Sequence, residues 1–229
     1  MNQVSSDEMM PLKAGFEPEY ELTNYFAESA LAISQLKEEA AVIREMAEGI
    51  WNCRKRGGKV LIAGNGGSCA DAEHFAGELV CTFSKRDRQP YSAISLTNNS
   101  SALTAWTNDF GFESYFDRQV LALGKAGDIL FLITTGGGDP ESGASMNLVS
   151  AANIATRNGM LVYAIAGKTG GLLSQISDKF IKVRSFSTAH IQEAHIAVIH
   201  AICLKLDQME SEGSHQPLAD DIQQGGVGA

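Results

Sequence analysis

Two reactive side chains follow a glycine-rich turn in the segment 59–78, which reads KVLIAGNGGSCADAEHFAGE. His74 and Glu78 are four residues apart, so on a helix they lie on the same face, above the same turn. An imidazole beside a carboxylate suits either a divalent metal ion or proton transfer to and from a substrate. The alternative is a histidine held by structural hydrogen bonds, but its position just after a glycine turn favours a functional role.

The turn itself, from Gly64 to Ser68, matches neither GxGxxG nor GxxxxGKS/T, the two common nucleotide-binding patterns. An apolar run precedes it and a helical pattern follows it. Backbone N–H groups at the helix start could therefore bind phosphate or sugar oxygens together with the Ser68 hydroxyl. The alternative is a tight turn in which Ser68 only caps the helix, and the turn alone favours neither.

A second group of reactive side chains lies towards the C-terminus, where three of the five histidines fall within eleven positions. Glu193 and His200 are seven residues apart and share a helix face, and Gln192 lies one position round. His200 and either Gln192 or Glu193 could therefore reach a common site. His190 and His195 point elsewhere, which predicts surface or interface positions for them as readily as functional ones.

A long helix must come before the strand that carries the turn. Apolar side chains recur at three- and four-residue steps from residue 18 to residue 56, with charged residues on the other face, and Gly57-Gly58 ends the pattern. A long amphipathic helix outside an α/β sheet packs against a partner subunit or over its own sheet, and this pattern fits both.

After this helix, strand and helix patterns alternate. Strands are expected at 59–63, 91–96, 127–135, 160–166 and 179–183. Helices are expected at 68–82, 100–107, 113–123, 145–158, 171–176 and 188–209, with a turn at 108–111. Near-continuous apolar strands between helices predict an α/β fold with a parallel sheet covered on both faces. Ligands bind such sheets at the carboxyl ends of the strands, where the glycine turn, residues 98–101 and residues 134–138 all lie.

Length and composition limit the class of protein. A chain of 229 residues suits one domain, which we expect at 18–209, with a mobile N-terminus (1–17) and a disordered tail (210–229). The formal net charge of −9 argues against non-specific binding of nucleic acid. We find no signal peptide and no apolar run long enough to span a membrane, and the four cysteines form no CxxC pair. We therefore expect a cytoplasmic protein with reduced thiols.

Three motifs, GNGGS-xxDAxHFAxEL, SALTAxxND-FGF and AxIQEAHIxxIH, resemble the sugar isomerase (SIS) domain, and within it the phosphoheptose isomerases. The resemblance covers residues 22–206. It implies a three-layer α/β sandwich with a five-stranded parallel sheet and a long N-terminal helix. It also implies a homotetramer in which that helix joins a central bundle and neighbouring subunits share the active sites.

The resemblance also implies a reaction. These isomerases convert sedoheptulose 7-phosphate to D-glycero-D-manno-heptose 7-phosphate through an enediol, with Glu78 in the position of the base and His200 in that of the acid. Members bind Zn²⁺ through the positions of His74, Glu78, Gln192 and His200. Whether the zinc is catalytic or regulatory is open, since a ligated Glu78 is not a free base. The substrate-binding positions implied are Asn65, Gly66, Gly67, Ser68, Asn99, Asp109, Thr134, Thr135, Gly136, Ser145 and Gln192.

The positions that anchor the substrate depart from the family pattern. The loop after the third expected strand lacks two of the usual hydroxyl groups and contains Asp139, which would repel a phosphate if it pointed inward. Ser145 is expected to supply the last family serine after an insertion. Elsewhere, Asn99 stands where an aspartate is common, and Thr82 and His190 stand where arginines are common. The basic side chains that could restore the charge are Lys85, Arg86 and Arg88.

Three other functions compete with this one. The chain could isomerise a different phosphosugar, because the anchoring positions are altered. It could be a non-catalytic SIS protein of the kind that binds a bacterial replication initiator, but such proteins tend to lose the glutamate or the last histidine, and both are present here. A sugar-phosphate-sensing regulator would carry a DNA-binding segment, and we see none beside the domain.

Overall fold

Five parallel strands form the central sheet, in the order β2-β1-β3-β4-β5. The computed structural model describes residues 21–213. The strands are β1 (Val60–Gly64), β2 (Ala93–Ser95), β3 (Ile129–Thr134), β4 (Leu161–Ala166) and β5 (Lys179–Lys182). The predicted five-stranded parallel sheet is confirmed, and β1, which carries the glycine turn, lies inside it.

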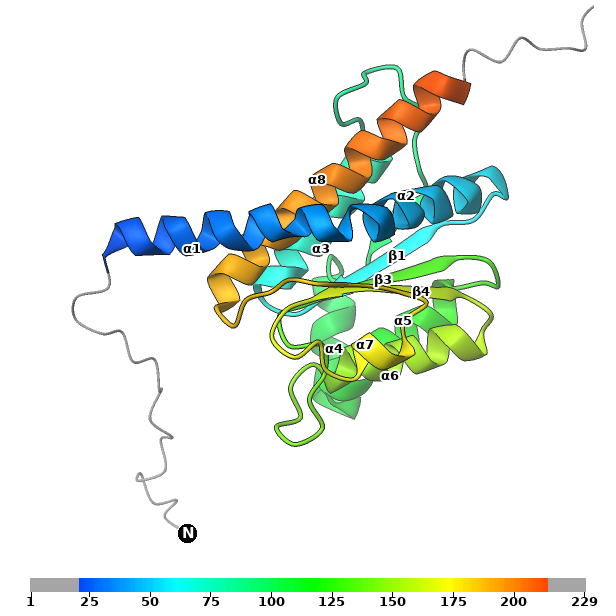
Figure 1. Cartoon of the computed structure of the whole chain (residues 1–229). Coiled ribbons are helices and arrows are strands. Elements are labelled where there is room, and N and C mark those ends of the chain that lie inside the picture. Colours follow the sequence, from blue (N-terminus) through cyan, green and yellow to red (C-terminus); the bar gives the residue numbers. More distant parts are fainter. Residues whose placement is uncertain (1–20, 214–229) are drawn as a thin grey trace, which may run out of the picture.

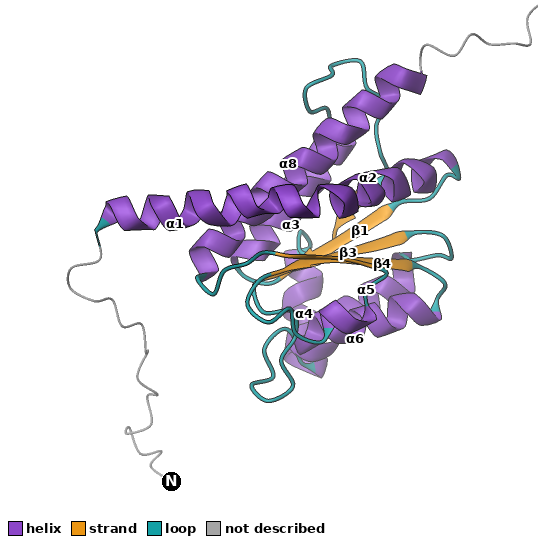
Figure 2. Ribbon diagram, viewed as in Figure 1, coloured by secondary structure: helices purple, strands orange, loops and turns teal. Residues whose placement is uncertain are grey.

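Helices cover both faces of the sheet and make three layers (Figures 1 and 2). One layer holds α1 (Leu22–Gln35), the 3-10 turn η1 (Leu36–Glu39), α2 (Ala40–Lys55), α3 (Gly67–Val80) and α8 (Thr188–Gly213). The other holds α4 (Ser100–Phe110), the 3-10 turn η2 (Phe112–Ser114), α5 (Tyr115–Leu123), α6 (Met146–Arg157) and α7 (Leu173–Ile176). None of the helices in residues 21–213 has the combined length and apolar character that a bilayer crossing needs.

Successive residues of each inner strand belong to opposite halves of the core. Val60 and Ile62 of β1 pack with α2, α3 and α8, whereas Leu61 and Ala63 pack with α5 and α6. Side chains alternate across a strand, so a strand that is apolar at every position is buried on both faces. This explains why the strand patterns in the sequence show no polar alternation.

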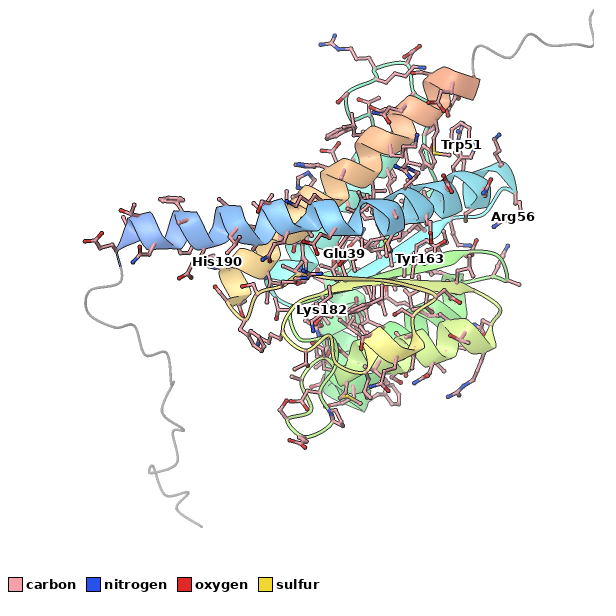
Figure 3. All side chains as sticks on the ribbon, viewed as in Figure 1. Glu39, Trp51, Arg56, Tyr163, Lys182 and His190 are labelled. Atoms are coloured by element: carbon pink, nitrogen blue, oxygen red, sulfur yellow. The ribbon has the colours of Figure 1, made fainter. Side chains whose placement is uncertain are left out.

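The helix α2 approaches the sheet closely at Gly49. A Cβ at that position would lie 2.0 Å from the hydroxyl oxygen of Tyr163 on β4, so only glycine leaves room for this ring (Figure 3). Burial raises the pKa of Tyr163 to about 12. The ring therefore acts as a neutral spacer between α2 and the sheet.

The long N-terminal helix is present, but it is not one uninterrupted α-helix. The 3-10 turn η1 separates α1 from α2, and the two helices continue along nearly the same line (Figure 1). The turn contains neither proline nor glycine. Apolar positions keep their spacing on both sides of it, so periodicity could not reveal the change in hydrogen bonding. Residues 18–20 of the predicted helix lie outside the described part of the chain.

Two predicted helix ends are wrong by more than two residues. Residues 108–110 were expected in a turn but complete α4, which ends at Gly111, where φ is 87°. Residues 210–213 were expected in the tail but form the last turn of α8. The Glu210 carboxylate accepts a hydrogen bond from Arg54 of α2 at 3.1 Å, which ties that turn to the body. The predicted mobile N-terminus and the rest of the tail fall outside the described residues.

Candidate active site

The glycine turn joins β1 to α3 at the carboxyl edge of the sheet. Gly66 caps α3 with φ 57° and ψ −123°, a conformation that would strain any residue with a side chain. Gly64 lies against Ser68, whose carbonyl oxygen would be 2.3 Å from a Cβ at position 64. Ser68 is buried in the first turn of α3 and donates its N–H to the Asn65 carbonyl oxygen at 3.0 Å. It is therefore not the cap residue that one interpretation of the turn required.

His74, Glu78 and His200 converge where α3 meets α8. His74 Nε2 lies 3.2 Å from Glu78 Oε1 and 3.3 Å from His200 Nε2. One ligand atom from each side chain lies within 4.8 Å of the other two, and within residues 21–213 no other His, Cys, Asp and Glu side chains form such a group. A neutral His74 can donate its Nε2 proton to only one of its two partners. A cation would satisfy all three groups at once, and two imidazoles with a carboxylate are a donor set that zinc favours.

Contacts along α3 and α8 set these helices side by side in a parallel register. At the start, the Gln192 amide lies against Gly67, where an added Cβ would be 2.1 Å from Gln192 Nε2. Next along both helices, His195 Nδ1 lies 3.7 Å from Asp71 Oδ2. The contact between the two histidines of the cluster follows. The glycine turn and the acid–base cluster therefore lie along one helix pair, with Gln192 at the turn.

Gln192 and Glu193 were the two alternatives to accompany His200, and they point in different directions. The Glu193 carboxylate accepts hydrogen bonds from the hydroxyl groups of Tyr25 and Ser29 on α1. This contact raises the pKa of Tyr25 above its usual value. Glu193 thus fastens α1 to α8, and Gln192 is the side chain that reaches the turn.

His190 and His195 are buried within the chain, so neither takes the surface or interface position that was one of the two alternatives for it. His195 has no exposed surface and faces Asp71 of α3. His190 is 3% exposed and packs edge-on against Tyr25, with the ring centroids 4.7 Å apart, close to α1 (Figure 3). Helix periodicity separates the faces of α8, but it does not say that α1 and α3 cover those faces.

The loop between β3 and α6 is organised around Thr134. Its hydroxyl lies 3.1 Å from the Ser145 hydroxyl and accepts the backbone N–H groups of Gly136 and Gly137 at 3.3 and 3.4 Å. Ser145 directly precedes α6 and has φ 59°. Ser145 therefore reaches Thr134 despite the inserted residues, and its role as the last serine of a phosphate loop stays a prediction.

Asp139 does not point into this loop. Its exposed carboxylate accepts the N–H of Glu141 at 3.0 Å and the hydroxyl of Ser142 at 2.6 Å. These hydrogen bonds, that from Ser142 above all, hold the pKa of Asp139 below its usual value. The carboxylate stabilises the turn at 139–142 and is engaged there.

The asparagines at this edge of the sheet hold the backbone in place. Asn65 and Asn147 of α6 exchange two amide hydrogen bonds, at 2.9 and 3.1 Å, which link the glycine turn to the start of α6. Asn99 caps α4 by accepting the N–H of Ala102 at 3.0 Å. Asn147 was not among the residues expected at the site. Its only signal is its place two residues after Ser145.

Two predicted residues take other roles. Asp109 is exposed on the last turn of α4 and accepts a hydrogen bond from Asn108 at 2.8 Å. Arg88, one of three residues expected to restore positive charge, is buried, and its guanidinium donates to the carbonyl oxygens of Glu78 and Leu79. The Arg88 guanidinium is therefore engaged inside the chain, with no exposed side-chain surface.

Comparison with known proteins places this arrangement in a family. The model of the SIS domain matches residues 24–167. The phosphoheptose isomerase of Neisseria meningitidis is 43% identical over 197 residues, which covers 82% of this chain and 94% of that protein. Phosphoheptose isomerase 1 of Campylobacter jejuni is 44% identical over 166 residues, 72% of this chain and 86% of that protein. The chain belongs to the phosphoheptose isomerases of the SIS-domain family.

The solved structures agree with this assignment. A phosphoheptose isomerase from Francisella tularensis superposes with a TM-score of 0.72 at 36% identity, covering 82% of this chain and 96% of that one. The chain is therefore an isomerase, and the prediction of a phosphosugar isomerase is confirmed. These relatives are enzymes, so the comparisons do not support the alternative of a non-catalytic binding protein.

Proposed function

We propose that this phosphoheptose isomerase interconverts sedoheptulose 7-phosphate and D-glycero-D-manno-heptose 7-phosphate through an enediol. The observation that carries the proposal is the meeting of Glu78 and His200, from different helices, across His74. A carboxylate and an imidazole so placed can act on neighbouring carbons of one substrate.

Glu78 is the base in this proposal. It removes a proton from C1, next to the C2 carbonyl of the ketose, and the enediol forms. His200 is the acid and delivers a proton to C2. The proton of the C1 hydroxyl passes to the C2 oxygen, so that C1 becomes the carbonyl carbon of the aldose and Glu78 keeps the proton taken from C1 until it exchanges with solvent. The charge that develops on the enediol oxygens needs fixed donors, and the N–H groups at the start of α3 and the Gln192 amide lie at the near end of the same helix pair.

The residues present fit a zinc ion. His74, Glu78 and His200 supply two imidazole nitrogens and a carboxylate oxygen within 4.8 Å, and we infer that the Gln192 amide oxygen is the fourth ligand. Bound zinc would polarise a carbonyl oxygen as a Lewis acid. Since a ligated Glu78 is not a free base, the ion either replaces part of the acid–base chemistry or regulates it.

Substrate anchoring is assigned to the carboxyl edge of the sheet. The candidates there are Asn65, Gly66, Gly67, Ser68, Asn99, Asp109, Thr134, Thr135, Gly136, Ser145 and Gln192. The Thr134 hydroxyl is already engaged within its own loop, which supports a second candidate function, the isomerisation of a ketose phosphate of different length. Thr135, which follows it and is only partly buried, would then carry more of the phosphate contact.

We also propose a homotetramer with active sites shared between subunits. Support comes from α1, whose apolar side chains Leu22, Phe26 and Leu31 are more than half exposed in the single chain. Exposed apolar surface of this extent on one helix is typical of an interface between proteins.

The test is turnover of sedoheptulose 7-phosphate, followed by NMR detection of the aldose phosphate. Glu78→Gln should reduce turnover by about a thousandfold or more without changing the fold or the oligomeric mass. The control is Glu73→Gln, an exposed carboxylate on the same helix, which should keep most of the activity. Activity that survives in Glu78→Gln overturns the assignment of the base.

A panel of ketose phosphates of five to seven carbons separates reaction class from substrate. The heptose phosphate should give the highest kcat/KM. Turnover of a shorter ketose phosphate without turnover of the heptose would keep the isomerase and replace the substrate.

A further inference from the structure

The loop at residues 81–90, which connects α3 to β2, is fastened to α8 by Asp207. The carboxylate of Asp207 is 5% exposed, and its Oδ2 accepts the backbone N–H groups of Ser84 and Lys85, each at 2.8 Å. Two charge-assisted hydrogen bonds to adjacent backbone groups hold a loop tightly. This is the basic loop that the sequence suggested for substrate binding. Its backbone N–H groups attach it to α8, the helix that carries His200.

Arg88 belongs to the same loop, and its side chain has no exposed surface. Its Nη2 donates to the carbonyl oxygen of Glu78 and, at 3.3 Å, to that of Leu79, while its Nε lies 3.4 Å from Asp207 Oδ1. The last carbonyl groups of a helix have no partners within the helix. Arg88 donates hydrogen bonds to two carbonyl groups at the end of α3, and one of these groups belongs to Glu78, the residue proposed as the base.

The same loop also reaches the proposed acid. Phe83 packs against His200 with ring centroids 5.4 Å apart and an interplanar angle of 32°. One short segment therefore contacts the backbone of Glu78 through Arg88 and the ring of His200 through Phe83. Asp207 contacts this segment twice, at the backbone next to Phe83 and at the Arg88 side chain.

We propose that Arg88 and Asp207 are positioning residues that fix Glu78 and His200 relative to each other. The proposal rests on the proposed function of these two residues. Proton transfer requires heavy atoms within about 3 Å, and a displacement of about 1 Å can reduce the rate a hundredfold. The planar guanidinium can engage two carbonyl groups and a carboxylate together, which a lysine ammonium on a flexible stem does not do in the same geometry.

A second ion pair provides a matched control. Arg54 and Glu210 join α2 to the same helix α8, and the Arg54 guanidinium carbon lies 5.0 Å from the ring of Tyr91. The Arg88 guanidinium carbon lies 5.1 Å from the same ring. The two arginines thus share their surroundings on one side, but only Arg88 bonds the backbone of Glu78 among the contacts seen in residues 21–213.

The experiment compares Arg88→Lys with Arg54→Lys in the full chain. In Arg88→Lys we expect kcat to fall about 30-fold or more while KM stays within about threefold, because positioning and not substrate binding is lost. The affinity for Zn²⁺, measured by calorimetry with the metal alone, should fall about tenfold, since the ligands lose their alignment. In Arg54→Lys both quantities should stay within about twofold of wild type.

Equal losses in the two variants, or wild-type kcat and Zn²⁺ affinity in Arg88→Lys, would overturn the proposal. If Arg88→Lys does not fold, Phe83→Leu leaves the ion pair intact and must itself lower kcat about fivefold or more; wild-type kcat there overturns the proposal as well. If the wild-type protein binds Zn²⁺ but turns over no ketose phosphate, only the proposed reaction is overturned. The Zn²⁺ affinities of Arg88→Lys and Arg54→Lys then test the positioning role of Arg88. A wild type that does neither overturns both.

Discussion

His74 is the residue on which the cluster depends, because its Nε2 faces both Glu78 and His200. We expect His74→Ala to weaken Zn²⁺ binding about a hundredfold, since one of two imidazole donors is lost. Competition with a fluorescent chelator measures this affinity. Unchanged affinity in the variant would remove His74 from the ligand set, and Glu73→Gln on the same helix serves as the control.

The cysteines differ in reactivity because only the thiolate is a nucleophile. Burial raises the pKa of Cys203 to about 12 and also raises that of Cys53, whereas Cys81 is exposed. At pH 8 a disulfide reagent should therefore modify Cys81 first, and Cys53 and Cys203 only as the chain unfolds. Mass spectrometry of the labelled peptides tests the order, and Cys81→Ser should remove the fast phase.

The same shift has a consequence for stability. A thiol whose folded pKa lies above its unfolded value of 9.0 binds its proton more tightly when folded. Cys203 therefore contributes stability below pH 9, and this contribution is lost as the pH rises towards 12. Cys203→Ala, which cannot ionise, should flatten the decline of the melting temperature between pH 9 and pH 11; an unchanged slope would contradict this.

At the scale of the element, α3 offers two glycines with opposite expectations. Gly77 is exposed within the helix, and nothing lies within 4 Å of a Cβ built there. Gly77→Ala should therefore raise the free energy of unfolding by about 1 kcal/mol, because alanine has the higher helix propensity. Urea unfolding measures the change, and a loss of stability would show that this face of α3 is covered in the assembled protein.

Gly67→Ala, ten residues earlier, should act on the site instead. The new Cβ would meet the end of the Gln192 side chain, which can swing away, so the fold should survive. With Gln192 displaced from the turn, we expect Zn²⁺ affinity and kcat/KM to fall about tenfold. Gly77→Ala is the matched control, and equal activity in the two variants would contradict a role for the Gln192 contact.

The sequence predicted the elements better than their contacts. Apolar periodicity located every strand and every main helix, because burial on both faces of a parallel sheet leaves a plain signal. It missed the end of α4 and the last turn of α8, where single residues such as Gly111 and Glu210 decide the boundary. It also could not say that α3 and α8 run parallel in register, since that depends on packing between segments over a hundred residues apart.

For the candidate site, too, the sequence predicted which residues take part but not which contacts orient them. Residue types and the family resemblance selected His74, Glu78 and His200, which the structure brings together. Charge alone suggested that Arg88 faces the substrate. Its direction is set instead by the carbonyl groups at the end of α3 and by Asp207, and no local sequence pattern predicts these contacts. Glu193 was an equal alternative to Gln192 until α1 supplied hydroxyl partners for it.

At the scale of the whole molecule, α1 extends past the body of the chain (Figure 1). It carries exposed apolar side chains. Leu22 is 74% exposed and Phe26 is 67% exposed, and next to them on α1 Tyr25 and Ser29 hold the helix to α8 through Glu193. Exposed apolar side chains on a helix that is held in place are typical of an interface, and a second copy of the chain offers the same surface by symmetry.

We therefore expect Phe26→Asp to convert the proposed tetramer into smaller species, because an unpaired carboxylate buried at the proposed interface would cost several kcal/mol. Light scattering after size-exclusion chromatography measures the mass. Leu121→Asp, on α5 in the opposite layer, should leave the mass unchanged although Leu121 is 54% exposed. If neighbouring subunits share the active sites as proposed, activity should fall together with the mass. A smaller species that keeps full kcat would show that each chain holds a complete site, and the His74, Glu78 and His200 cluster would then suffice without a neighbour.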